Sequence, residues 1–166
     1  AIRFDINDVR IFVGRDSSGV RGIKLKPNDY VVSMSLIPEE EEKFVLSVTE
    51  NGFGKRTVIN DYRKTNRGGQ GVANIECSDR NGPVVASYIV ASSDQIMLVT
   101  NAGKLIRIKV HENENNSIRV TGRKTQGVKL FDVDDDEKVM SVALLVESED
   151  DEVSNEDVDQ ENEDNS

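Results

Sequence analysis

The sequence predicts an all-β fold of propeller-like blades, each with about four strands. Short runs of β-branched and apolar residues recur about every 8–12 residues, with turn residues such as Pro27-Asn28-Asp29 and Asn81-Gly82-Pro83 between them. No stretch keeps apolar residues at helical spacing for three turns, so helices should be minor. A repeat with a period near 50 residues favours blades over a helical solenoid.

The repeat consists of a basic residue that ends a short apolar segment, followed 11 to 16 positions later by Arg-x-x-x-Gly-Val. The basic residues, called the first arginines below, are Arg3, Arg56 and Arg107. The Gly-Val motifs end three segments, called the arginine loops, at residues 14–20, 66–72 and 122–128. Their arginines, the second arginines, are Arg15, Arg67 and Arg123. These copies predict about two and a half units, roughly 1–37, 44–90 and 96–146, with an amino end that resembles a cut through a unit.

The turn residues divide the chain into expected strands. In order, these are residues 20–25, 30–37, 43–50, 54–59, 71–77, 83–90, 95–100, 103–110, 117–120, 127–133 and 138–146. Within 103–110, alternation puts Leu105 and Arg107 on one face and Ile106 and Ile108 on the other. Two segments interrupt the pattern: 39–42 is expected to be an acidic solvated loop, and 111–116 a polar insertion.

The net charge of −10 combines two different regions. Residues 147–166 carry 11 acids and no bases, so we expect them to be a disordered acidic tail. Residues 1–146 are expected to form the folded domain, in which basic and acidic segments alternate. The basic segments 1–26, 54–71 and 101–129 carry +3, +4 and +5, and they contain the arginine loops. A nucleic-acid partner is therefore compatible with the acidic overall balance.

Several other classes of function are disfavoured. A lone Cys77 cannot form an internal disulfide and suits a reducing cytoplasm. No apolar run reaches the ~20 residues of a membrane span, and no signal peptide is visible. His111 is the only histidine, which excludes a histidine zinc cluster or a histidine-dependent triad. The phosphate-loop pattern fails at Thr49 and at Arg56, and a calcium-loop pattern from Asp132 lacks its terminal Glu. We expect no catalytic residues, metal or cofactor in this chain.

The arginine loops have two interpretations. In one, their arginines are exposed turn residues that serve solubility alone. In the other, a charge that recurs at one position of each unit marks a binding surface, as equivalent loops do in repeat proteins. Glycines beside arginine favour a phosphate ligand, because the bare backbone permits close approach and guanidinium donates two hydrogen bonds.

Six motifs together resemble a known family. They are GFGKRT, DYRKTNRGGQGV, DRNGPVV, VTNAGKLIR, VTGRKTQGVKL and GVRGIKL, and the resemblance that they carry covers essentially all of residues 1–146. They are similar to the carboxy-terminal DNA-wrapping domain of the A subunit of bacterial DNA gyrase. The resemblance implies a β-pinwheel, a six-bladed propeller-like disc with strands exchanged between neighbouring blades and DNA bent around its basic rim.

Two features depart from the family pattern. The gyrase-A box, Gln-[Arg/Lys]-Arg-Gly-Gly-[Arg/Lys]-Gly, is absent, and its nearest relative is TNRGGQG from Thr65. In the family the box lies in the first blade, so this partial match is typical of a later blade. The strand-passage core is also missing: Tyr30, Tyr62 and Tyr88 do not follow an arginine, as the family's nucleophile does.

The resemblance implies non-specific binding and bending of duplex DNA, in support of ATP-dependent negative supercoiling by a type IIA topoisomerase. The expected DNA-binding residues are Arg15, Lys55, Arg56, Arg63, Lys64, Arg67, Gly68, Gly69, Gly71, Lys104, Arg107, Arg123 and Lys124. ATP and magnesium would act through other domains and subunits of the holoenzyme. The implied partners there are the B subunit of gyrase together with a second A subunit, at the nucleoid in the cytoplasm. Two alternatives stay open: the corresponding subunit of topoisomerase IV, and a protein-interaction propeller without nucleic acid.

Overall fold

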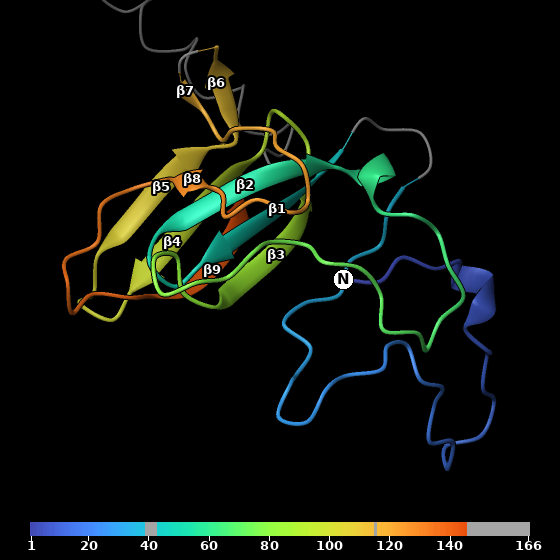
Figure 1. Ribbon diagram of the computed structural model, residues 1–166. Coiled ribbons are helices and arrows are strands. Elements are labelled where there is room, and N and C mark those ends of the chain that lie inside the picture. Colours follow the sequence, from blue (N-terminus) through green and yellow to red (C-terminus); the bar gives the residue numbers. More distant parts are fainter. Residues whose placement is uncertain (39–42, 115, 146–166) are drawn as a thin grey trace, which may run out of the picture.

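The computed structural model describes residues 1–38, 43–114 and 116–145 (Figure 1). Within these ranges the regular structure is nearly all antiparallel β-sheet, as predicted. Two short 3₁₀ helices, η1 (Ile6–Asp8) and η2 (Ile59–Asp61), have the same sequence, Ile-Asn-Asp. None of the described helices is long and apolar enough to cross a membrane.

The first sheet contains four strands in the order β3-β1-β2-β8. Strands β1 (Phe44–Thr49) and β2 (Phe53–Val58) form a hairpin, and β3 (Val84–Val90) returns to pair with β1. The hairpin turn needs Gly52, whose φ is +76°. The fourth strand, β8 (Val128–Lys129), comes from the following unit and pairs with the start of β2. This pairing joins neighbouring units through a shared strand.

The second sheet has the same arrangement as the first sheet and belongs to the next unit of the repeat. Its strand order is β5-β4-β9. It contains β4 (Gln95–Thr100), β5 (Leu105–Lys109) and β9 (Val139–Leu145). The burial of β5 alternates as predicted, with Arg107 exposed and its neighbours Ile106 and Ile108 partly buried. A separate two-stranded ribbon of β6 (His111–Asn113) and β7 (Asn116–Ser117) projects from the molecule, where the polar insertion was expected (Figure 1).

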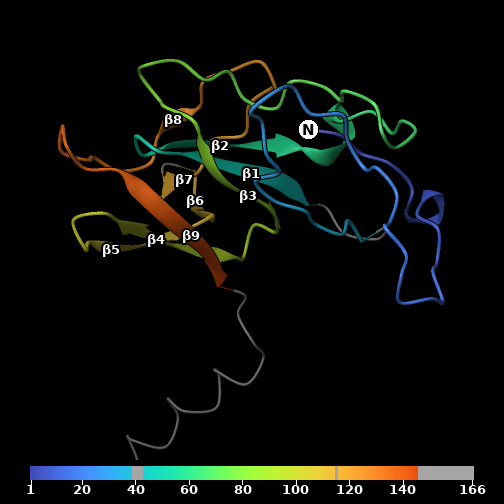
Figure 2. The ribbon, with the colours of Figure 1, turned by 90° about the horizontal axis from the view of Figure 1, so that it is seen from below.

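The hydrophobic core lies between the two larger sheets, which form stacked layers in Figure 2. Leu46 and Val90 of the first sheet are fully buried, as are Ile96 and Leu98 of the second. Each such side chain contributes roughly 1.5–3 kcal/mol of apolar burial. A hydrogen bond from Tyr88 Oη to the carbonyl of Val142, 2.5 Å long, fixes one layer against the other.

Three expected strands do not form. Residues 30–37 correspond to β3 and β9, but no strand among the described residues pairs with them. Met34 and Leu36 are therefore 91 % and 75 % exposed. Residues 20–25 and 71–77 lie along neighbouring units as loops, held by single backbone bonds. The strands expected at 117–120 and 127–133 shorten to β7 and β8, because only a few of their residues meet a partner.

The described residues leave some expectations open. The unit boundaries at 1–37, 44–90 and 96–146 stay a prediction. The acidic loop at 39–42 and the acidic tail at 147–166 lie outside the described residues.

Candidate nucleic-acid interface

Two of the first arginines, Arg3 and Arg56, connect consecutive units through their side chains. Arg56 on β2 is 4 % exposed, and its Nε donates to the carbonyl of Ile118 at 2.6 Å. Arg3 does the same one unit earlier, where its Nη1 donates to the carbonyls of Ile59 and Tyr62 at 3.2 and 3.4 Å. These contacts occupy the guanidinium groups with backbone. The predicted phosphate contact by Arg56 is wrong in this structure, because its side chain is buried under the next unit.

Backbone bonds beside the first arginines repeat in the same register. The amide of Thr65 donates to the carbonyl of Arg3, and the amide of Thr121 donates to the carbonyl of Arg56, at 2.9 and 2.8 Å. Single parallel bridges pair Arg3 with Lys64 and Arg56 with Val120. These pairs define the equivalent positions of the two units and bring their arginine loops into one register.

Two of the second arginines, Arg67 and Arg123, donate to the preceding unit. Arg67 Nη1 donates to the carbonyl of Arg21 at 3.1 Å, and Arg123 Nη1 donates to the carbonyl of Ala73 at 2.9 Å. Arg67 additionally donates from Nε to the carbonyl of Asp8. Both side chains are half-buried. A guanidinium has five N–H donors, so each arginine holds its loop in place and still has donors for a ligand.

Lys55 is fully buried, which corrects its predicted role as a phosphate contact. Its Nζ donates to the carbonyls of Gly122 and Arg123 at 2.7 and 2.8 Å. Burial, together with the charge of Arg123, lowers the pKa of Lys55 to about 8, while Asp61 acts in the opposite direction. A buried ammonium is tolerated here because two carbonyl dipoles solvate it.

The glycines of the arginine loops serve close packing between units. Gly71 has φ +76°, and a Cβ there would lie 2.1 Å from the carbonyl oxygen of Ala1. Gly68 also has positive φ and donates its amide to the carbonyl of Gly22 at 2.6 Å. Gly69 is exposed. Contact with the preceding unit thus accounts for Gly68 and Gly71 without a ligand.

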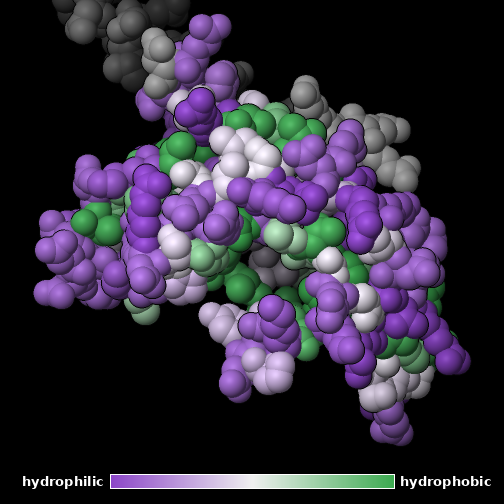
Figure 3. Space-filling model, in the orientation of Figure 1, coloured by the Kyte–Doolittle hydropathy of each residue, from purple (hydrophilic) through white to green (hydrophobic). Residues whose placement is uncertain are grey.

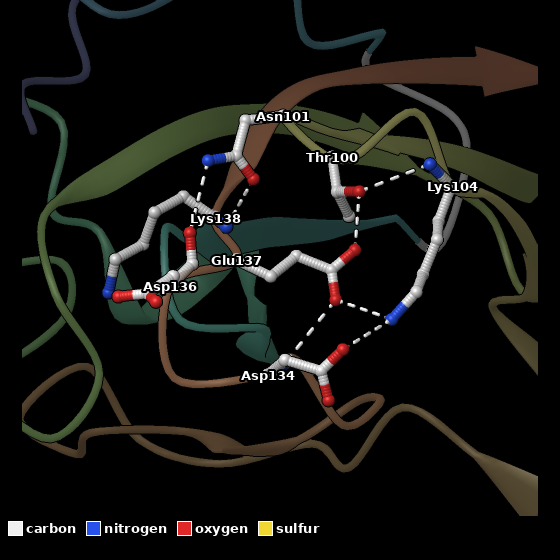
Figure 4. Close-up of polar contacts among 7 residues, drawn as sticks. All are labelled: Thr100, Asn101, Lys104, Asp134, Asp136, Glu137 and Lys138. Carbon is white, nitrogen blue, oxygen red and sulfur yellow. Dashed lines mark hydrogen bonds and ion pairs between the residues drawn. The ribbon is translucent and has the colours of Figure 1, made fainter.

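Two expected contact lysines form ion pairs. Lys104 Nζ lies 2.6 Å from Glu137 and 3.0 Å from Asp134 (Figure 4). The hydrogen bond to Glu137 raises the pKa of Lys104, and the same bond lowers the pKa of Glu137. Lys64 is bonded to Asp5 across units. Their charges are largely compensated, which weakens both as phosphate ligands.

The remaining expected residues are exposed. Arg107 donates to Gln95 at 2.7 Å, while Arg15, Arg63 and Lys124 have no carboxylate within ion-pair distance among the described residues. Figure 2 shows that the chain around 60–80 and 118–130 runs along one side of the molecule, opposite β4 and β5. Hydrophilic side chains cover much of the face in Figure 3. The structure thus leaves a smaller set of exposed, uncompensated cations than the sequence predicted.

Sequence reasoning missed Arg119. It is exposed and lies four positions before Arg123, as Arg63 lies four positions before Arg67. That recurring spacing is a signal that could have identified it. In the described part of the chain, no group of three or more His, Cys, Asp or Glu residues is placed to hold a metal ion.

Known proteins resemble this chain over most of its length. A family model described as "DNA gyrase C-terminal domain, beta-propeller" matches residues 1–38, 43–90 and 94–145. The DNA gyrase A subunit from Rickettsia prowazekii is 38% identical over 94% of this chain and 22% of the relative. The A subunit from Staphylococcus epidermidis is 42% identical over 90% of this chain and 16% of the relative. The chain thus spans about a fifth of these relatives.

Solved structures agree with these relatives. The C-terminal domain of DNA topoisomerase IV superposes with a TM-score of 0.75 at 29% identity, over 86% of this chain and 42% of that one. The DNA gyrase A C-terminal domain superposes with a TM-score of 0.69 at 28% identity, over 86% of this chain and 46% of that one. Sequence, strand exchange and superposition lead to one assignment: the chain belongs to the DNA gyrase C-terminal domain family of β-propellers.

Proposed function

We propose that the chain binds duplex DNA through its phosphates, without sequence preference, and curves it as part of the A subunit of a DNA gyrase. The observation that carries this proposal is the set of exposed, uncompensated cations on the repeated loops, which includes Arg63 and Lys124. Side chains on turns reach backbone phosphates more easily than base edges in a groove, so sequence preference should be weak.

The repeat supports curvature as well as affinity. Successive units present equivalent loops, and each unit is fastened to the one before by Arg67 or Arg123. A duplex that follows these loops must take the curvature of the array, and its bending cost would be offset by phosphate contacts at each unit. In the whole protein, this bent segment would be presented for ATP-dependent strand passage.

The holoenzyme's other requirements are part of the same proposal. ATP and magnesium would be bound by other domains and subunits, and the partners would be the B subunit of gyrase together with a second A subunit. The site of action would be the cytoplasmic nucleoid. The topoisomerase IV subunit is a second candidate, favoured by the TM-score of 0.75 to its C-terminal domain. Supercoiling of relaxed plasmid by the whole protein separates the two, because only a gyrase introduces negative supercoils.

A salt titration tests DNA binding directly. The affinity of the 166-residue chain for a fluorescent duplex of unrelated sequence would be measured by anisotropy between about 50 and 200 mM salt. Four to six phosphate contacts predict a log–log slope of about −4 to −5. A second duplex of different sequence should bind equally well. A slope near zero would refute the proposal and favour a protein-interaction propeller.

A further inference from the structure

Residues 118–124 lie along the outer edge of β2 with their backbone already fixed. Arg56 donates from its amide to the carbonyl of Arg119 at 2.9 Å, and from Nε to that of Ile118 at 2.6 Å. Thr57 Oγ1 donates to the carbonyl of Thr121 at 2.9 Å. Three carbonyl oxygens of the segment therefore face β2 and are satisfied there.

Lys55 satisfies two more carbonyls of the same segment. Its buried ammonium donates to Gly122 and Arg123 at 2.7 and 2.8 Å. Backbone carbonyls repel an approaching phosphate, and here five of them point to donors on β2. The cations of Lys55 and Arg56 lie beneath the segment and add positive potential to its outer side.

Arg119 is exposed on this fixed backbone. Among the described residues its side chain has no carboxylate partner, unlike Lys64 or Lys129, which are paired with Asp5 and Asp132. The backbone register makes Arg119 equivalent to Arg63, because Thr121 and Thr65 donate to the carbonyls of Arg56 and Arg3. An exposed arginine without a carboxylate partner among the described residues thus recurs at one position of two units. In each unit it lies four residues before the arginine that donates to the preceding unit, Arg67 or Arg123.

We propose that residues 118–124 are a preformed phosphate-binding element, in which Arg119 contacts the duplex and Lys55 is a positioning residue. This inference rests on the proposed function. Because Arg119 has no carboxylate partner among the described residues, its guanidinium can make a bidentate, charge-assisted contact with a phosphate. Because the backbone is ordered before DNA arrives, little conformational entropy remains to be lost on binding.

Lys55 acts through the backbone of the loop. Loss of its ammonium removes a donor from the carbonyls of Arg123 and Gly122 and leaves Gly122 with the Thr125 hydroxyl alone, so the loop must shift to find new donors. A bound phosphate would also favour the charged form of Lys55, whose pKa burial holds at about 8. DNA binding should then be accompanied by proton uptake near that pH. The charged groups that face Lys55 are Arg123 and Asp61.

The first test compares matched variants of the full chain by duplex anisotropy at about 50 mM salt. Arg119→Ala should weaken binding about tenfold and lower the salt slope by about 1. Lys109→Ala is the control, because Lys109 is exposed but paired with Glu112 at 3.1 Å; it should bind almost as the unaltered chain does. Arg119→Ala binding as tightly as Lys109→Ala would overturn the inference. A flat salt dependence of the unaltered chain would instead refute the proposed function.

The second test is the pH profile of affinity. The unaltered chain should lose affinity between about pH 7 and 9 as Lys55 deprotonates, whereas Lys55→Met should bind more weakly with a flatter profile. The amino group of Ala1 lies near Arg123, and burial lowers its pKa too, so both proteins are compared with this group acetylated. Identical profiles for the two would refute the positioning role. If circular dichroism shows that Lys55→Met does not fold, the unaltered chain alone decides the test. A flat pH profile of its affinity would then refute the positioning role of Lys55.

Discussion

Arg123 donates from Nη1 to the carbonyl of Ala73 at 2.9 Å, across 50 residues of sequence. Arg67 makes the equivalent bond to Arg21 at 3.1 Å. These arginines have a structural role that their charge alone does not reveal. The array of units is held by side-chain donors that reach backward along the chain, and the loops they hold carry the cations proposed to bind DNA.

Removal of either of these two hydrogen bonds between units should reduce the free energy of unfolding. The sequence alone predicts little change on Arg67→Ala or Arg123→Ala, if both side chains are exposed. Their half-buried positions and backbone bonds change this expectation to a loss of about 1 kcal/mol each, or roughly 2–4 °C in melting temperature. Arg15→Ala, at an exposed equivalent position, is the control. If calorimetry finds the same melting temperature for all three variants and the unaltered chain, the hydrogen bonds of Arg67 and Arg123 do not stabilise the fold.

Gly127 should be intolerant of a side chain. Its φ is +79°, and a Cβ would lie 2.7 Å from the carbonyl oxygen of Gly54 on β2. Gly127→Ala should lower the free energy of unfolding by about 2–4 kcal/mol, from backbone strain and the clash at the exchanged strand. Gly122→Ala in the same loop is the matched control, because its Cβ meets no atom within 4 Å. Equal urea midpoints for the two variants would contradict this prediction. They would show that the loop before β8 can move away from Gly54 without loss of stability.

Stability should rise with pH through the titration of Lys55. Its pKa is about 8 in the folded chain, against an ordinary value of 10.5. Between these values the unfolded chain binds more protons, so the free energy of unfolding increases as the pH rises from 8 toward 10.5. Urea unfolding at about pH 7.5, 9 and 10 measures this, and Lys55→Met should show a smaller increase. A parallel increase in both proteins would assign the effect to other groups.

Deletion of residues 147–166 should tighten DNA binding at low salt. The segment carries 11 acids and no bases, so it would compete with phosphate for the cations of the arginine loops. The gain should shrink as salt approaches ~0.15 M, where the screening length is about 8 Å. Anisotropy with the full and shortened chains at about 50 mM salt measures the difference. Equal affinities there would leave the acidic segment as a solubilising tail.

Local patterns predicted the hairpins well, because their causes are local. The turn at Gly52 and the alternation around Arg107 are encoded in adjacent residues. Residues 30–37 have the same strand composition as β3, but they remain unpaired, since a strand also needs a partner that composition does not supply.

The site was predicted less well, since charge does not reveal which way a side chain faces. Lys55 and Arg56 are basic and adjacent, yet both are buried against the following unit. Arg119 lies beside the polar insertion at 111–116, which changes the spacing of the third unit and hides its equivalence to Arg63. The backbone bonds of Thr65 and Thr121 reveal this equivalence.

The central claim is that the chain curves duplex DNA by holding its phosphates on repeated loops. Energy transfer between dyes on the two ends of a duplex of about 60 base pairs tests it most directly, with two unrelated sequences. We expect transfer to increase when the full chain binds, equally for both sequences, and to return to the free value as salt displaces the protein. Binding with no change in transfer, or an increase limited to one sequence, would contradict the account.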